Sequence, residues 1–130
     1  MLAFREVIEA HDPTRIADTL AEGVVFTSPV GFRPYPGKAL TTAILQNVME
    51  VFDDFRYIRE IGADGDADRS LVFEASIHGK QLTGCDFLHL DEDGKIDDFM
   101  VMVRPLSAAK ALAEEMSARF PRIQEQASAR

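Results

Sequence analysis

The chain has 130 residues, of which 46% are hydrophobic and 28% charged, and its formal net charge is −8 at pH 7. This length and composition are typical of a globular domain that buries a substantial hydrophobic core. The acidic balance, with a pI of about 4.8, argues against nucleic acids and anionic membranes as partners, because both carry negative charge themselves.

The cellular compartment is indicated by cysteine usage and by apolar run length. Cys85 is the single cysteine of the sequence, so no disulfide can form within the chain, which fits a reducing compartment. No apolar run approaches the roughly 20 residues of a membrane span. Residues 1–4 lead directly into an acidic amphipathic stretch rather than a signal peptide. We therefore expect a cytoplasmic protein without a membrane-spanning segment.

The first part of the chain is predicted to be mainly helical. Residues 2–10 place apolar side chains at helical spacing. A second helix is expected to begin at Asp12, a good N-cap followed by proline, and to end at Gly23. A short strand at 24–29 and a loop rich in proline and glycine come next. A third helix is expected at 39–52, because its apolar residues again recur at helical spacing.

The second part of the chain is predicted to form strands. They are expected at residues 55–61, 70–78, 81–90 and 96–104, separated by the turn sequences GADGD, GK and DEDG. A last helix at 107–120 is expected to stop before Pro121 and to leave a frayed tail at 122–130. The predicted fold class is therefore α+β, a single domain over residues 1–121 with helices on one face of a curved antiparallel sheet.

The segment LTGCDFLHL, residues 82–90, contains an acidic residue on an otherwise apolar face. Strand alternation places Asp86 on the same face as four neutral residues, Leu82, Gly84, Leu88 and Leu90. Burying a carboxylate without a partner costs free energy. Asp86 is therefore the first candidate for a functional residue.

The turns on either side of this strand predict the neighbours of Asp86. A turn at Gly79-Lys80 would put Phe73 opposite Asp86, and a turn at Asp93-Gly94 would put Val101 opposite it on the other side. Both assignments put the apolar residues on one face, and a slip of one residue would invert every side chain. Asp86 is thus expected on the inner face of the sheet, without a basic neighbour.

The other face of the same strands is also apolar. It carries five residues, Val72, Cys85, Phe87, Met100 and Met102. An exposed apolar patch of this size favours a homodimer in which a second copy covers the outer sheet face. Cys85 is then interpreted as a residue of this contact rather than a nucleophile. The histidines do not converge with carboxylates at ligand spacing, so no metal site is expected.

Three segments carry a family resemblance by their order and spacing: AHDPTRIADTLAEGVVFTSPVG, PYPGKALTTAIL and CDFLHLDEDGKIDDF. Together they resemble the NTF2-like superfamily and, within it, the SnoaL-like and ketosteroid-isomerase-like proteins. The resemblance covers roughly Phe4 to Pro105. It implies a cone in which a strongly curved sheet wraps helices around an apolar pocket, often with a homodimer through the outer sheet face.

The resemblance to ketosteroid isomerases implies a role for Asp86. In those enzymes an aspartate nine residues before the lysine of the following turn donates a hydrogen bond to the substrate oxyanion, and Asp86 and Lys95 have this spacing. The position of their general-base aspartate is Ser28, and that of their first-helix tyrosine is Phe4. Polyketide cyclases of the family pair the aspartate with a histidine of a neighbouring strand, which this sequence lacks beside Asp86.

We predict that Asp86 is the catalytic or ligand-contacting group and that nine further residues line the pocket. They are Phe4, Phe26, Ser28, Tyr35, Tyr57, Phe73, Leu88, Phe99 and Val101. Tyr35 is alternatively a loop tyrosine outside the pocket, and Tyr57 alternatively lies at the dimer rim.

Two functions stay open. One is a pocket protein for a small apolar ligand, acting without a cofactor as an isomerase, lyase, hydrolase or cyclase that uses Asp86. The other is a non-catalytic binding or dimerisation module with a vestigial pocket.

Overall fold

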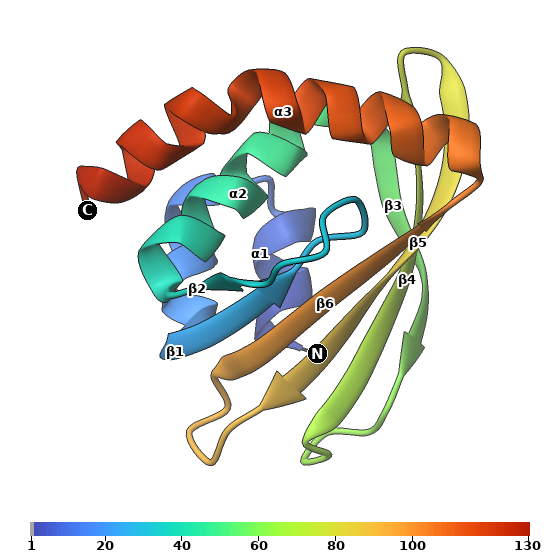
Figure 1. Cartoon of the computed structure of the whole chain (residues 1–130). Coiled ribbons are helices and arrows are strands. Elements are labelled where there is room, and N and C mark those ends of the chain that lie inside the picture. Colours follow the sequence, from blue (N-terminus) through green and yellow to red (C-terminus); the bar gives the residue numbers. More distant parts are fainter. Residues whose placement is uncertain (1) are drawn as a thin grey trace.

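The computed structural model describes residues 2–130, which form a six-stranded sheet curved around three α-helices (Figure 1). The elements are α1 (Ala3–Glu9), the 3-10 helix η1 (Pro13–Thr19), β1 (Leu20–Thr27), β2 (Tyr35–Pro36), α2 (Lys38–Val51), β3 (Asp53–Ile61), β4 (Asp68–Ile77), β5 (Lys80–Leu90), β6 (Ile96–Arg104) and α3 (Leu106–Ser128). The strand order is β2-β1-β6-β5-β4-β3. Neighbouring strands are antiparallel except β1 and β6, which are parallel. The predicted α+β class is confirmed.

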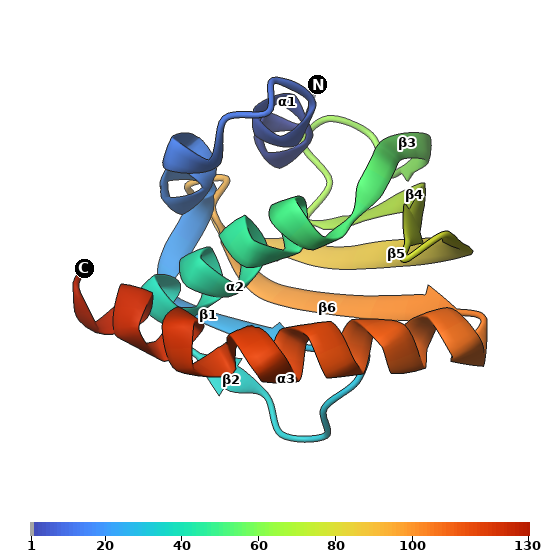
Figure 2. The ribbon, with the colours of Figure 1, turned by 90° about the horizontal axis from the view of Figure 1, so that it is seen from above.

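The helices all lie on the inner side of the curved sheet (Figure 2). β4 shows why, since its buried and half-buried residues alternate and its inner positions Leu71, Phe73, Ala75 and Ile77 are at most 2% exposed. This alternation gives the sheet one apolar face that must pack against another layer. Within residues 2–130, no helix is long and apolar enough to span a membrane.

The prediction of a helix from Asp12 to Gly23 is wrong in its second half. The Asp12 side chain does cap a helical segment, accepting the N–H of Thr14 at 3.2 Å, but this segment is the short η1. β1 then begins at Leu20, four residues earlier than predicted, and Leu20 pairs with Ile96 of β6. Pairing with β6 supplies backbone hydrogen bonds and full burial of Leu20, which is 1% exposed, so tertiary contacts override the local helical preference.

The prediction that the last helix stops before Pro121 and leaves a frayed tail is also wrong. α3 continues through Pro121 to Ser128, and Ile123 in this extension is completely buried. Asn47 of α2 donates a hydrogen bond of 2.8 Å to the side chain of Gln126. Proline in a helix removes one hydrogen bond, and the packing of this extension against α2 outweighs that loss.

The predicted register of the β4–β5 hairpin is shifted by two residues. The turn is His78-Gly79, both with positive φ, so Ile77 pairs with Lys80. Asp86 therefore lies opposite Leu71 instead of Phe73, while its predicted pairing with Val101 of β6 is confirmed. A two-residue shift keeps every side chain on its predicted face because the period of a strand is two.

Gly84 occupies the position opposite Phe73 in this register. A Cβ atom added at Gly84 would lie 2.2 Å from Cζ of Phe73, whose ring is 2% exposed. The ring thus fills the space that a side chain at this position would take. The absence of a side chain at Gly84 leaves room for the tip of the Phe73 ring on the inner face of the sheet.

Gly84→Ala is expected to lower the free energy of unfolding by about 1–3 kcal/mol, because overpacking forces Phe73 out of its position. The matched control is Gly23→Ala in β1, where an added Cβ meets no atom within 4 Å and the free energy of unfolding should be unchanged or higher. Urea unfolding followed by circular dichroism measures both. Equal midpoints for the two variants would contradict the contact between Phe73 and Gly84.

Candidate functional site

A cavity of about 500 Å³ lies between the inner face of the sheet and the helices. Aromatic rings form much of its wall, and they are Phe4 of α1, Phe26 of β1, Phe52 after α2, Phe55 of β3, Phe73 of β4 and Phe99 of β6. The rings contact one another, with Phe4 and Phe99 edge to face at 5.1 Å and Phe55 and Phe73 at 4.8 Å between centroids. These contacts fix the shape of the cavity and make it largely apolar.

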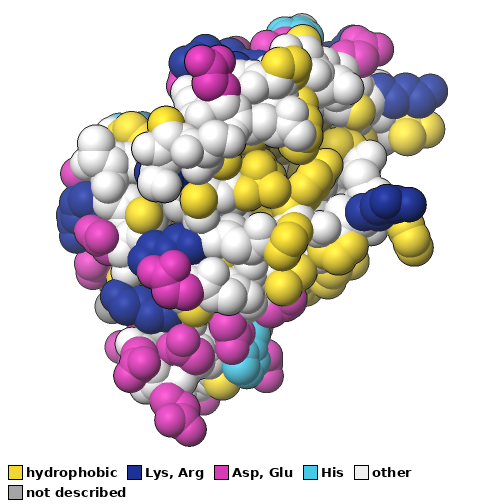
Figure 3. All heavy atoms as spheres, turned by 60° about the vertical axis from the view of Figure 1, so that its left-hand side comes forward, with side chains coloured by type: hydrophobic (Ala, Val, Ile, Leu, Met, Phe, Trp, Pro, Cys, Tyr) yellow, Lys and Arg dark blue, Asp and Glu magenta, His cyan; other side chains and the backbone are white. Residues whose placement is uncertain are grey.

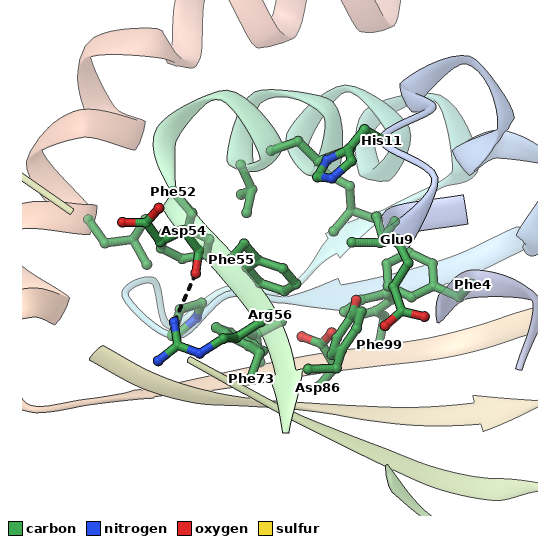
Figure 4. Close-up of a pocket in the computed structure, with 18 of the residues that line it drawn as sticks. Phe4, Glu9, His11, Phe52, Asp54, Phe55, Arg56, Phe73, Asp86 and Phe99 are labelled. Atoms are coloured by element: carbon green, nitrogen blue, oxygen red, sulfur yellow. Dashed lines mark hydrogen bonds between the residues drawn. The ribbon is translucent and has the colours of Figure 1, made fainter. Parts of the chain in front are cut away.

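Asp86 lies in the wall of this cavity, on β5 between Leu71 and Val101 (Figure 4). Its side chain is nearly inaccessible, since the residue is 6% exposed. Among residues 2–130, no group donates a hydrogen bond to its carboxyl oxygens and no cation forms an ion pair with it. Burial without a compensating partner raises the pKa of Asp86 from 3.8 to about 8. Near neutral pH, Asp86 is therefore mostly a neutral carboxylic acid with an O–H that can donate.

Tyr57 of β3 lines the same cavity. Burial raises the pKa of its phenol, and the charges of Asp86 and Glu9 raise it further, whereas Arg5 lowers it. The hydroxyl therefore keeps its proton, and it forms no hydrogen bond with any other described residue. The Arg5 guanidinium lies 5.6 Å from the centre of the ring. Asp86 and Tyr57 are thus two neutral donors on the cavity wall.

Four further polar or charged residues line the cavity and were not predicted. They are Glu9, His11, Asp54 and Arg56. His11 and Asp54 have φ values of 54° and 52°, in the left-handed region that residues other than glycine seldom adopt. Strained backbone of this kind concentrates at functional sites. His11 lies two residues after α1, and Asp54 is the second residue of β3; at neither position does the sequence carry a signal that marks a cavity wall.

Most of the predicted lining residues are brought together with Asp86. Phe4, Phe26, Tyr57, Phe73, Phe99 and Val101 all line its cavity. Tyr57, for which the dimer rim was the alternative, is among the residues that line this cavity.

Ser28 and Tyr35 line a second, neighbouring cavity of about 570 Å³ instead, between the loop that precedes β2 and the helices α2 and α3. The Ser28 hydroxyl accepts a hydrogen bond from the N–H of Val30, and the Tyr35 ring packs 5.6 Å from that of Phe120. Apolar side chains gather around a hollow on the side of the molecule where β2 and the end of α3 lie (Figure 3).

Leu88 lines neither cavity and is buried in the core, opposite Arg69 and Phe99. It lies on the same sheet face as Asp86, two residues further along β5, where it packs among the side chains of the hydrophobic core.

The structure also shows the surroundings of the cysteine and of a histidine, the residue types that could act as a nucleophile or bind a metal ion. Cys85 is half-buried, lines neither cavity, and has its pKa raised by burial. His89 is bound to Asp97 at 2.6 Å, and this hydrogen bond raises its pKa. Within residues 2–130, no three His, Cys, Asp or Glu side chains are placed to hold a metal ion.

The model of the SnoaL-like domain matches residues 1–99. The chain belongs to this family. A steroid delta-isomerase from Pseudomonas aeruginosa is 35% identical, with a TM-score of 0.86 over 94% of this chain and 89% of that one. A bacterial protein with a cystatin-like fold from Silicibacter pomeroyi DSS-3 is 32% identical, with a TM-score of 0.84 over 95% of this chain and 90% of that one.

Proteins of lower sequence identity share the same fold. A de novo designed protein with a curved β-sheet matches at 17% identity, with a TM-score of 0.67 over 85% of this chain and 94% of that one, which concerns the fold alone. No curated protein sequence matches the chain significantly. The SnoaL-like domain is thus an NTF2-like, cystatin-like cone related to ketosteroid isomerases, and the predicted family and fold are confirmed.

The raised pKa of Asp86 predicts a specific pH dependence of stability. Between about pH 4 and pH 8 the folded chain holds a proton on Asp86 that the unfolded chain has lost. The stabilising contribution of the protonated form is therefore complete below pH 4 and is lost as pH rises to 8, at up to about 1.4 kcal/mol per pH unit. Asp86→Asn removes the titrating carboxyl group and with it this loss of stability. The variant should therefore become more stable than wild type as pH rises.

The measurement is the difference in free energy of unfolding between wild type and Asp86→Asn, from urea unfolding at several pH values between 4 and 9. The difference cancels titrations that the two proteins share. Glu6→Gln, at an exposed position of α1, is the control and should show no such trend. If Asp86→Asn is less stable than wild type at every pH, the carboxyl group is instead an anion stabilised by its surroundings, and the prediction of a raised pKa is wrong.

Proposed function

We propose that this SnoaL-like domain binds a small, largely apolar ligand in the Asp86 cavity, and that neutral Asp86 donates a hydrogen bond to an oxygen of that ligand. The environment of Asp86 supports this proposal. The residue is 6% exposed, faces a largely apolar cavity and has no hydrogen-bond partner among residues 2–130. Buried polar groups are almost always hydrogen-bonded. A ligand oxygen would satisfy this one.

Acid–base chemistry without a cofactor is the form of catalysis that this arrangement supports best. A neutral acid can stabilise negative charge as it develops on a carbonyl oxygen, because its hydrogen bond strengthens with that charge. The reaction class would be an isomerase, lyase, hydrolase or cyclase. The similarity to a steroid delta-isomerase supports this class, whereas Phe4 and Ser28 differ from the groups that ketosteroid isomerases use. A non-catalytic binding module is the alternative.

Binding of 1-tetralone, a two-ring apolar ketone, tests the proposal. Asp86→Leu should weaken binding at pH 6 by roughly tenfold, since a hydrogen bond in a dry site is worth on the order of 1–2 kcal/mol. Wild-type affinity should fall above pH 8, because the ionised carboxylate no longer donates and repels the ketone oxygen. Titration followed by ligand NMR measures both effects.

The carbonyl stretch of bound 1-tetralone provides a direct readout of the hydrogen bond. It should lie at lower frequency in wild type than in Asp86→Leu. Cys85→Ala is the matched control, because it changes the neighbouring residue on the opposite sheet face and should bind like wild type. Equal affinity and equal carbonyl frequency in wild type and Asp86→Leu would contradict the proposal.

We also propose that a second copy of the chain covers the outer sheet face. Phe87 and Met102 are 38% and 53% exposed there, next to half-buried Val72, Cys85 and Met100. These residues pair across three adjacent strands, Cys85 with both Val72 and Met102, and Phe87 with Met100. They therefore form one continuous apolar patch, and the helices of residues 2–130 all lie on the opposite, inner side of the sheet (Figure 2).

Met102→Glu should convert the dimer into a monomer, because it places charges on both sides of the two-fold contact. Phe32→Glu is the control, since Phe32 is 98% exposed on the loop before β2 and lies outside the sheet. Sedimentation velocity at micromolar concentration measures the masses. A monomeric wild type would contradict the dimer.

A further inference from the structure

The second cavity shares part of its wall with the Asp86 cavity. Four residues line both cavities, and they are Phe26 of β1, Pro29 of the following loop, Val48 of α2 and Leu112 of α3. The second cavity has a volume of about 570 Å³, similar to the 500 Å³ of the Asp86 cavity. The two cavities are therefore adjacent, and single side chains rather than a thick layer of core stand between them.

The second cavity differs from the Asp86 cavity in charge. Several acidic and basic residues line the Asp86 cavity, whereas none of the acidic or basic residues within 2–130 lines the second one. The polar side chains of the second cavity are those of Ser28, Tyr35 and Ser117. The Ser28 hydroxyl already accepts a hydrogen bond from the N–H of Val30. The rest of the wall is mainly aliphatic and aromatic, which fits an uncharged hydrocarbon group.

The shared wall determines which hydrocarbon skeleton can occupy both cavities. Phe26 and Leu112 are each 3% exposed, so the wall is closely packed. A fused ring system would have to displace several of these side chains together, and close packing makes that costly. An unbranched alkyl chain is the narrowest apolar skeleton, and it can pass when one or two side chains change rotamer. The wall thus favours a chain over a ring at the junction.

We propose that the second cavity binds the alkyl tail of a ligand whose oxygen-bearing head lies in the Asp86 cavity. This rests on the proposed function and adds a substrate class to it, namely carbonyl compounds that carry an unbranched chain on the side away from the carbonyl. The tail passes beside Val48 and Leu112, which line both cavities. It ends near Ala113 and Met116, which line only the second one.

1-Tetralone and 6-hexyl-1-tetralone are a matched pair of probes for this tail site. They share the ketone head, and the second carries an alkyl chain on the far side of the rings from the carbonyl. Each CH2 group that moves from water into an apolar site improves affinity about fourfold. Wild type should therefore bind 6-hexyl-1-tetralone at least a hundredfold more tightly than 1-tetralone, as measured by equilibrium dialysis.

Ala113→Phe tests the location of the tail, because it places a ring in the second cavity from a half-buried position of α3. The variant should lose most of the gain from the hexyl chain and still bind 1-tetralone within about twofold of wild type. Ala118→Phe is the matched control, since Ala118 is exposed on the same helix and lines neither cavity. It should keep the full gain.

Methionine methyl groups report the position of the tail without any substitution. Met116 lines only the second cavity, and Met49 lines only the Asp86 cavity. In wild type with isotope-labelled methionine methyl groups, the terminal methyl of the hexyl chain should show NOEs to Met116, and the tetralone ring protons should show NOEs to Met49. Met100 and Met102 line neither cavity and should show no NOEs to the ligand.

The outcomes separate the tail site from the proposed function. Equal affinity of wild type for the two ketones, or an equal gain in wild type and Ala113→Phe, would overturn the tail site. NOEs from the terminal methyl to Met49 instead of Met116 would also overturn it. Each of these results leaves the binding of 1-tetralone, and with it the proposed function, intact. No binding of 1-tetralone to wild type would overturn both.

Discussion

The burial of an uncompensated carboxyl group against an aromatic cavity is the constraint on which the chemistry of this protein depends. Asp86 occupies a central strand, with Leu71 and Val101 as its cross-strand neighbours and no cation within ion-pair distance among the described residues. Desolvation holds it in the neutral form at a pH where an exposed aspartate is ionised. Such a group costs stability above its pKa, and the rest of the fold must supply the free energy that keeps it there.

The curved sheet and the helices supply that free energy. Inner positions of β4 and β5 are almost completely buried, and the phenyl rings at Phe4, Phe73 and Phe99 pack around the cavity. Gly84 contributes by having no side chain, which lets Phe73 lie against β5. The sheet curves enough to leave space between it and the helices, and the helices stop that space from collapsing. A designed protein with a curved sheet shares this fold at 17% identity, so the shape itself requires few specific residues.

Polar interactions around the cavity are arranged in a chain that starts outside it. Arg69, with a side chain 3% exposed, binds Glu60 at 2.9 Å, and Glu60 in turn binds Arg5. Arg5 then contacts both Glu9 and the ring of Tyr57. Partly buried ion pairs of this kind give little net stability, but they fix side-chain positions. Here they hold the Glu9 side chain at one side of the cavity, whereas Asp86 lies on the sheet.

The sequence by itself determined the fold class, the family and the inner face of the sheet. It also placed Asp86 on that face although the β4–β5 register was two residues off, because strand alternation depends on parity alone. Only the tertiary structure decided what depends on long-range contacts. The parallel pairing of Leu20 with Ile96 replaced a predicted helix, and the burial of Ile123 carried α3 past Pro121. Ser28 and Tyr35 belong to a second cavity, and Glu9 lines the first together with Asp86, because cavity walls are assembled from distant segments whose relative positions no local pattern encodes.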